Sequence, residues 1–218
     1  MNSNDKISEA GIEEYRPLNI REILFRIPIT VWILLANFAM YCYTALLSGN
    51  FEIIRVEVLE FFGVSAAAFV QGRYYVLLTA MFVHQDILHF GLNIFALAVI
   101  GLVFEKEGGR KNFLIIYFLA GLITNTLSLI LFPLLVFIGA SAAIFGIAGA
   151  TIMRQLQSVM FGALFILALF AMAPPLSFLS HGIGAVVGVV SDYFIMRKTN
   201  MKKPNMRDRI ATYTDKHQ

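Results

Sequence analysis

Six apolar stretches, separated by short polar links, constrain this chain more than any other feature. They lie at about residues 27–47, 87–104, 112–132, 141–156, 158–173 and 177–196. Crossing a hydrocarbon core takes about 20 apolar residues in a helix, because a spanning backbone must form its hydrogen bonds within itself. Of the 218 residues, 58% are hydrophobic and 14% charged, against about 25% charged in a soluble domain. The sequence therefore predicts an all-α, multi-pass membrane protein with six transmembrane helices.

The basic residues predict which side of the membrane each link occupies. Lysine and arginine occur between the second and third stretches, at the end of the fourth at Arg154, and throughout residues 197–218. Positively charged links stay in the cytoplasm, so six spans place both termini there. We expect a short cytoplasmic segment at 1–26, a membrane domain at 27–196, a basic cytoplasmic tail at 197–218, and a location in the plasma membrane. Such a tail indicates orientation and not a nucleic-acid partner.

Two segments break the regular pattern. Residues 48–86 form a long outer link that is itself rather apolar, which suggests a segment partly embedded in the membrane. The fourth stretch is short, since about 13 residues from Ser141 to Met153 cover only some 20 Å. Its outer end is therefore expected below the membrane surface. Residues 134–140 are expected to descend to it as non-helical backbone, which is tolerated only inside protein or beside a water-filled cavity.

Polar side chains within membrane helices are rare and are functional candidates by default. His89 and Asn93 lie four residues apart, Ser141 opens the fourth stretch, and His181 lies near the start of the sixth. The second, fourth and sixth stretches all run from outside to inside. All four residues then lie within about 10 Å of the outer helix ends, at about 1.5 Å per residue. We expect them to meet at one depth.

These residue types fit acyl transfer by a serine. A serine hydroxyl needs a neighbouring base, and His181 is the candidate base for Ser141. The Ser141 amide, the Asn93 side chain and the His89 imidazole are candidate donors to a developing oxyanion at the positive end of the fourth helix. No Asp or Glu in these spans is placed to orient His181, which favours a dyad over a triad.

Three further residues are expected to support this pair. Gly184 and Gly188 share a face with His181, and they would let the sixth helix approach the fourth closely, as small residues do in membranes. Phe145 lies one turn into the fourth helix and would stack on the His181 ring.

Each of these residues also has a structural interpretation when it is taken alone. An isolated membrane serine usually bonds to its own helix, and His89 with Asn93 would favour an interhelical hydrogen bond. Gly184 and Gly188 would serve only in ordinary helix packing. A catalytic role is favoured only because all of these polar residues are expected at the same depth.

The motifs that carry these residues, from about Tyr75 to Gly188, resemble the rhomboid family of intramembrane serine proteases. The matching segments are FVHQDILHFGLN (Phe82–Asn93), the four-residue series Gly101, Glu105, Gly109, Phe113 and Tyr117, GASAAIFG (Gly139–Gly146) and HGIGAVVG (His181–Gly188). The first resembles the family's H-x-x-x-N signature with a preceding histidine, His84. The third resembles the nucleophile segment, and the last resembles H-x-x-G-x-x-x-G.

The resemblance implies a six-helix core with Ser141 as the nucleophile and His181 as the base. It assigns the oxyanion and substrate-binding region to four residues: His89, Asn93, Phe145 and Gly139. It implies that the substrates are single-span transmembrane proteins cut near the outer membrane face, and that no cofactor is needed.

Two positions differ from the family's usual pattern. The nucleophile motif usually reads G-x-S-G, and Ala142 stands at its last position. A Trp-Arg pair often found in the outer loop is replaced by Tyr75 and Val76, with Arg73 nearby. Neither difference removes a predicted catalytic group.

Three other functions fit parts of the pattern. A catalytically inactive relative that binds membrane helices is expected to lack Ser141 or His181, and both are present. A transporter or channel would distribute polar residues through both halves of the membrane, whereas here they gather on one side. A metal site built from His84, His89 and His181 has no carboxylate or thiolate companion. The sequence thus predicts an intramembrane serine endopeptidase that binds no metal.

Overall fold

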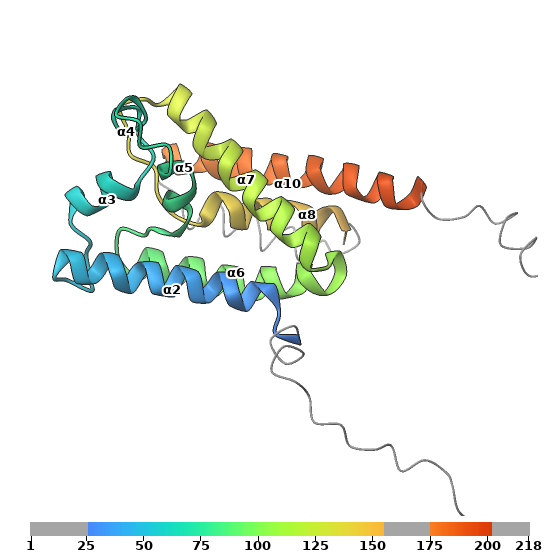
Figure 1. Ribbon diagram of the computed structural model, residues 1–218. Coiled ribbons are helices and arrows are strands. Elements are labelled where there is room, and N and C mark those ends of the chain that lie inside the picture. The colour runs from blue at the N-terminus through green and yellow to red at the C-terminus, as the bar shows by residue number, and fades with distance from the viewer. Residues whose placement is uncertain (1–25, 155–174, 202–218) are drawn as a thin grey trace, which may run out of the picture.

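The structure is a computed structural model that describes residues 26–154 and 175–201, with the side chains of the last helix described from Leu179 to Thr199 (Figure 1). Its elements are α2 (Ile29–Ser48), α3 (Val56–Phe62), α4 (Ala66–Val70), α5 (Val76–Thr79), the 3-10 turn η1 (Ala80–Phe82), α6 (Ile87–Gly108), α7 (Arg110–Leu131), α8 (Ser141–Arg154) and α10 (Pro175–Met201). Within these residues every regular element is a helix.

Four of the described helices are long and apolar enough to cross a membrane: Ile29–Ser48, Ile87–Gly108, Arg110–Leu131 and Leu179–Thr199. The expected all-α, multi-pass membrane architecture is confirmed for this part of the chain. The expected helix at 158–173 lies outside the described residues. So do nearly all of the expected segment 1–26 and most of the tail 197–218.

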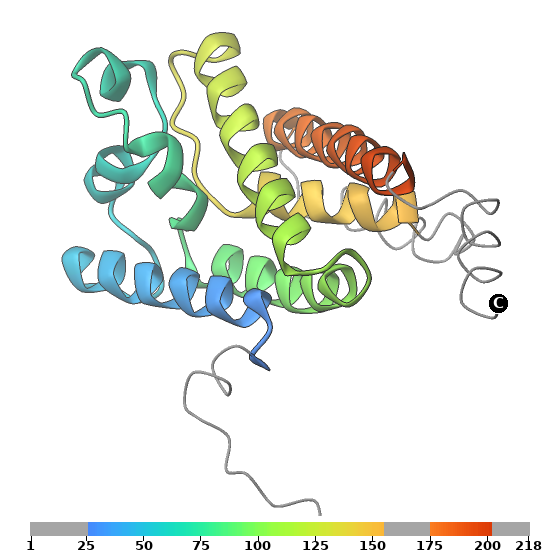
Figure 2. The ribbon, with the colours of Figure 1, turned by 45° about the vertical axis from the view of Figure 1, so that its right-hand side comes forward.

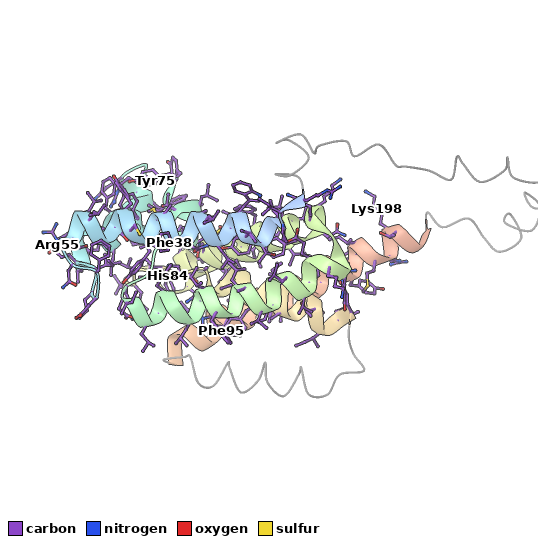
Figure 3. All side chains as sticks on the ribbon, turned by 90° about the horizontal axis from the view of Figure 1, so that it is seen from below. Phe38, Arg55, Tyr75, His84, Phe95 and Lys198 are labelled. Carbon is purple, nitrogen blue, oxygen red and sulfur yellow. The ribbon has the colours of Figure 1, made fainter. Side chains whose placement is uncertain are left out.

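Three helices run in the same direction. In Figure 1, α6, α8 and α10 all begin at the end of the bundle where α3, α4 and α5 lie, and all end at the opposite end. Figure 2, turned by 45°, shows the same directions. Arg55 and Tyr75 mark the first end and Lys198 the second (Figure 3). This arrangement is the one expected for the second, fourth and sixth stretches, so their first turns lie toward one end of the molecule.

Helix α8 forms the centre of the bundle. Its 14 residues span about 21 Å, and it begins deeper inside the molecule than the long helices beside it (Figures 1 and 2). Ten consecutive residues, from Ala142 to Thr151, are buried, and the helix packs against α6, α7 and α10. Many of these residues are Gly or Ala, whose small side chains let neighbouring backbones approach closely.

Glycines set the contact between α8 and α10. A Cβ atom on Gly184 would overlap the carbonyl oxygen of Ala142, and one on Gly188 would overlap the carbonyl oxygen of Gly146. In the other direction, a Cβ atom on Gly149 would overlap the backbone of Ala185. The structure therefore brings the two helices together backbone to backbone, at Gly184 and Gly188, which the sequence singled out, and also at Gly149.

The outer connection between α2 and α6 contains three short helices that the sequence analysis did not foresee. The carbonyl oxygens at the end of α3 are capped by side chains from the following segment. Arg73 donates to the carbonyls of Glu60 and Phe61 at 3.2 and 3.1 Å, and Thr79 donates to Phe62 at 2.9 Å. Arg73 and Thr79 thus anchor the outer loop, in which Tyr75 and Val76 stand in place of the family's Trp-Arg pair.

The segment before α8 descends as extended backbone, as expected. Val64 and Phe137 exchange two backbone hydrogen bonds of 2.9 and 2.8 Å, and the Gly139 amide donates to the carbonyl of Ala80 at 2.8 Å. Non-helical backbone at membrane depth needs such partners, because it forms no hydrogen bonds within a helix of its own. The outer connection therefore supplies the hydrogen bonds that hold the approach to Ser141.

Glu105, near the end of α6, fixes the beginning of α2. Its carboxylate accepts hydrogen bonds from the backbone amides of Ile29 and Thr30 at 2.7 and 2.9 Å and from the Thr30 hydroxyl at 2.8 Å. The preceding residue, Pro28, provides no side-chain cap. The carboxylate takes the place of a capping side chain at the positive end of the helix.

We expect Glu105→Ala to lower the free energy of unfolding by roughly 2–4 kcal/mol, because hydrogen bonds to a charged group contribute about 1.5–3 kcal/mol each and do not add fully. Thermal unfolding in detergent measures the change. Glu57→Ala, which removes an exposed carboxylate from α3, is the control and should leave the melting temperature nearly unchanged. Equal melting temperatures for the two variants would contradict the capping role.

Candidate active site

Ser141 is the first residue of α8, at the end of the descending segment. Gly139, two residues earlier, has a φ of 109°, a conformation that residues with a side chain rarely adopt. The chain therefore turns into the helix just before Ser141, and the amides at the start of a helix have no partners within that helix. A helix N-terminus attracts negative charge, which suits a developing oxyanion.

His181 is held by an aromatic contact. Its ring stacks on Phe145 with centroids 4.3 Å apart and planes at 25°, and the residue is only 4% exposed. Phe145 lies one turn after Ser141 on the same face of α8. The structure therefore places the imidazole beside the part of α8 that carries the serine.

His89 borders the space next to Ser141. A Cβ atom on Gly139 would lie 3.1 Å from His89 Nε2 and 3.7 Å from Ser141 Oγ. The missing side chain of Gly139 thus leaves a small space between the imidazole and the hydroxyl. Any residue with a side chain at position 139 would fill this space.

Asn93 is buried, with 1% of its surface exposed. Its amide nitrogen donates to the carbonyl of His89 at 2.8 Å, and within the described chain its Oδ1 atom has no hydrogen-bond partner. The bond to His89 agrees with a structural role in the substrate-free protein. The nitrogen keeps a second N–H that can donate elsewhere, so a part in oxyanion binding stays a prediction.

Asn93→Ala is expected to lower turnover by about 100-fold to 1000-fold, the usual effect of removing an oxyanion donor. Stability should fall much less, since one hydrogen bond contributes about 1 kcal/mol. Steady-state cleavage and thermal unfolding of the same preparation separate the two effects. Wild-type turnover in this variant would return Asn93 to a purely structural role.

The structure adds His84 to the residues around the site. It is fully buried, and its Nε2 atom accepts a hydrogen bond of 3.5 Å from the amide of Ala140, the residue before the serine. Its ring meets the rings of His89 and Phe90 edge-on, at centroid distances of 5.1 and 5.6 Å. Only its place five residues before the H-x-x-x-N segment could have signalled this supporting role.

Burial, reinforced by the neighbouring His89, lowers the pKa of His84 to about 3 from its usual 6.5. In the unfolded chain His84 takes up a proton near pH 6.5, whereas in the folded protein it takes up the proton only near pH 3. The folded state is therefore destabilised progressively as the pH falls through this range.

Within the described residues, no carboxylate accepts a hydrogen bond from the His181 ring, whose Nδ1 atom has no hydrogen-bond partner there. Asp86 lies nearby but caps α6, accepting the amide of His89 at 2.7 Å. In the same part of the chain, no group of three or more His, Cys, Asp or Glu side chains has the arrangement of a metal site. His84, His89 and His181 thus do not form one there.

The family model for the rhomboid domain matches residues 71–198, which is more than half of the chain and includes every predicted site residue. The chain belongs to the rhomboid family. The family resemblance found in the sequence motifs is therefore confirmed, and the matched region begins directly after α4 and ends within α10.

Several relatives are similar over the same core. "Rhomboid-like protease 3" of Toxoplasma gondii is 35% identical over 119 residues, which cover 55% of this chain and 45% of that protein. "Rhomboid protease GluP" of Bacillus subtilis is 36% identical over 114 residues, covering 52% and 22%. "RHOMBOID-like protein 6, mitochondrial" of Arabidopsis thaliana is 30% identical over 82 residues, covering 38% and 27%. This rhomboid spans less than half the length of these relatives.

Proposed function

We propose that this rhomboid is an intramembrane serine endopeptidase in which Ser141 and His181 form the catalytic dyad. The stack of His181 on Phe145, at 4.3 Å between centroids, is the observation that carries the proposal. The stack holds the imidazole beside the first turn of α8. Within the described chain, Ser141 is the only serine that begins a buried apolar helix. Two of the three relatives are named as proteases.

The chemistry needs only side chains and a backbone amide of this chain, together with water. His181 takes the proton of Ser141 as Oγ attacks the scissile carbonyl carbon, which gives a tetrahedral oxyanion. The amide of Ser141 with His89 and Asn93 would donate to that oxygen in the space left by Gly139. His181 then gives the proton to the leaving amine. It next activates the water that hydrolyses the acyl enzyme and frees Ser141.

The proposed substrates are single-span transmembrane proteins cut near the outer membrane face. The family to which the chain belongs supports this substrate class, and the short helix that Ser141 begins supports a cut below the outer membrane surface. The proposal includes six transmembrane helices, with the fifth at 158–173, cytoplasmic termini and a plasma-membrane location.

A reporter fused after Gln218 should behave as cytoplasmic. If the reporter were found outside the cell, the proposed orientation of every span would be reversed.

The test is cleavage of a generic single-span substrate by the purified full-length protein in detergent or liposomes. Wild type should release two fragments, Ser141→Ala should release none, and EDTA should leave the rate unchanged. The Ser141→Ala variant removes only a hydroxyl at a half-buried position, so it should fold and serves as the matched control. Activity that is lost in EDTA and restored by zinc would overturn the serine mechanism.

A further inference from the structure

An aromatic stack joins α2 to the first turn of α6, and the two helices lie side by side (Figures 1 and 2). The rings of Tyr41 and Phe90 have centroids 4.3 Å apart and planes at 13°, and both side chains are buried. Phe90 follows His89 in the chain, and its ring also meets the His84 ring edge-on, at 5.6 Å between centroids. Through one ring, α2 thus contacts the turn of α6 that carries a proposed oxyanion donor.

The Tyr41 hydroxyl makes a second contact, with the chain that follows α2. It donates a hydrogen bond of 2.6 Å to the carbonyl of Phe51. Two backbone hydrogen bonds of 2.8 and 3.0 Å then pair residues 52–54 with residues 85–87, where α6 begins. Tyr41 therefore holds α6 through its ring, and it holds the residues that lead into α6 through its hydroxyl.

These contacts reach the two histidines near the serine. Residues 85–87 connect His84 to the turn that carries His89. His84 accepts the hydrogen bond from the amide of Ala140, and the His89 imidazole borders the space beside the serine. Tyr41 therefore contacts, directly or through one further segment, the backbone that carries both imidazoles.

Rotation of the first turn of α6 would move His89 relative to the serine. A side chain extends to about 5–6 Å from the axis of its helix, so a rotation by about 10° displaces it by about 1 Å. A misplacement of about 1 Å can cost about 100-fold in rate. Since Phe90 belongs to the same turn, such a rotation would also displace its ring from Tyr41, and the stack therefore opposes it.

We propose that Tyr41 is a positioning residue of the active site, which holds the imidazoles of His84 and His89 in place from α2. It touches no reacting group. It also lies outside residues 71–198, so the match to the rhomboid domain assigns no role to it. The catalytic consequence rests on the proposed function, whereas the placement of the two histidines does not.

The test compares two substitutions of Tyr41 with two controls. Tyr41→Leu removes both contacts, and Tyr41→Phe removes only the hydroxyl and keeps the ring. Tyr43→Leu removes an exposed tyrosine two residues further along the same helix and is the matched control. Glu105→Ala removes the carboxylate that binds the first amides of α2, so it loosens α2 without touching the stack and is the stability control.

The first readout is the rate of substrate cleavage, measured at a temperature at which each variant is folded by its own melting curve. Tyr41→Leu should lower kcat by about 10-fold to 100-fold. It should change KM much less, because the displaced His89 faces an oxyanion that forms only in the transition state. Tyr41→Phe should lie between wild type and Tyr41→Leu. Tyr43→Leu and Glu105→Ala should keep kcat near that of wild type, although Glu105→Ala melts at a lower temperature.

The second readout follows the histidines without any activity. The protein has four histidines, so the ring signals of protein labelled with ¹⁵N-histidine can be assigned by single substitutions. Nitrogen shifts of an imidazole report its tautomer and its hydrogen bonds. Both Tyr41 variants should shift or broaden the signals of His84 and His89, and Tyr43→Leu should not. Tyr41→Phe keeps an aromatic ring at this position, so its effect does not come from the loss of a ring current.

The two readouts separate the positioning role from general stabilisation and from the proposed function. An equal loss of kcat in Tyr41→Leu and Glu105→Ala would mean that loosening α2 is sufficient, and would overturn the proposal. Wild-type signals of His84 and His89 in the Tyr41 variants would overturn it whatever the rates are. If Tyr41→Leu does not fold, Tyr41→Phe decides by the same signals and by its kcat. A wild type that cleaves no substrate and takes up no serine probe overturns the proposed function, and the histidine signals then decide the positioning role alone.

Discussion

A fluorophosphonate is expected to label this rhomboid at Ser141, because an activated serine reacts with such a probe even when no substrate helix is present. Labelling should vanish in Ser141→Ala and fall at least about 1000-fold in His181→Ala, as removal of the base does in other serine proteases. Gel fluorescence and mass spectrometry of the modified peptide measure the outcome. Ser177→Ala and Ser180→Ala are the controls and should label normally.

A graded variant tests how the base is held. Phe145→Ala removes the ring that stacks on His181 at 4.3 Å, so the imidazole should remain present but spend less time aligned. Its labelling rate is expected between those of wild type and His181→Ala. A folded wild-type protein that takes up no probe between pH 6 and 9, a range over which an ordinary imidazole becomes neutral with a pKa of about 6.5, would contradict the dyad. It would favour a helix-binding function.

Gly139→Ala is expected to lower turnover by about 100-fold to 1000-fold, because its methyl group would occupy the proposed oxyanion space. A Cβ atom there would lie 3.0 Å from Cε1 and 3.1 Å from Nε2 of His89. The substitution also strains the backbone, since φ is 109° at this residue. The ratio kcat/KM and the melting temperature should be measured together.

Gly72→Ala is the matched control for Gly139→Ala. Gly72 also has a positive φ, of 78°, but nothing lies within 4 Å of the position of its Cβ atom. The control therefore carries a backbone penalty, about 1–2 kcal/mol for a left-handed residue, without filling the site. Gly72→Ala should lose some stability and keep its turnover. An equal loss of turnover in both variants would mean that strain, and not the filled space, causes the effect.

The sequence singled out the residues of the proposed site, but not all of the contacts that hold them. His89, Asn93, Ser141 and His181 were found because intramembrane polar groups are costly, and four of them at one depth need a reason. The stack of Phe145 on His181 followed from helical spacing, since residues four apart share a face. The bond from Asn93 to the His89 carbonyl and the burial of His84 were not foreseen, because side-chain rotamers leave no periodic pattern in the sequence.

The sequence by itself predicted the four long apolar helices of the described chain, the common direction of α6, α8 and α10, and the short length of α8. Apolar length and four-residue spacing are local properties, and a membrane helix forms its backbone hydrogen bonds within itself. Only the tertiary structure decided how the non-helical parts are held. The amide of Ala140 donates a hydrogen bond to His84, 56 residues away in the sequence. The first amides of α2 donate to the carboxylate of Glu105, 75 or more residues away. Such partners depend on how distant segments fold over one another, so no local pattern encodes them.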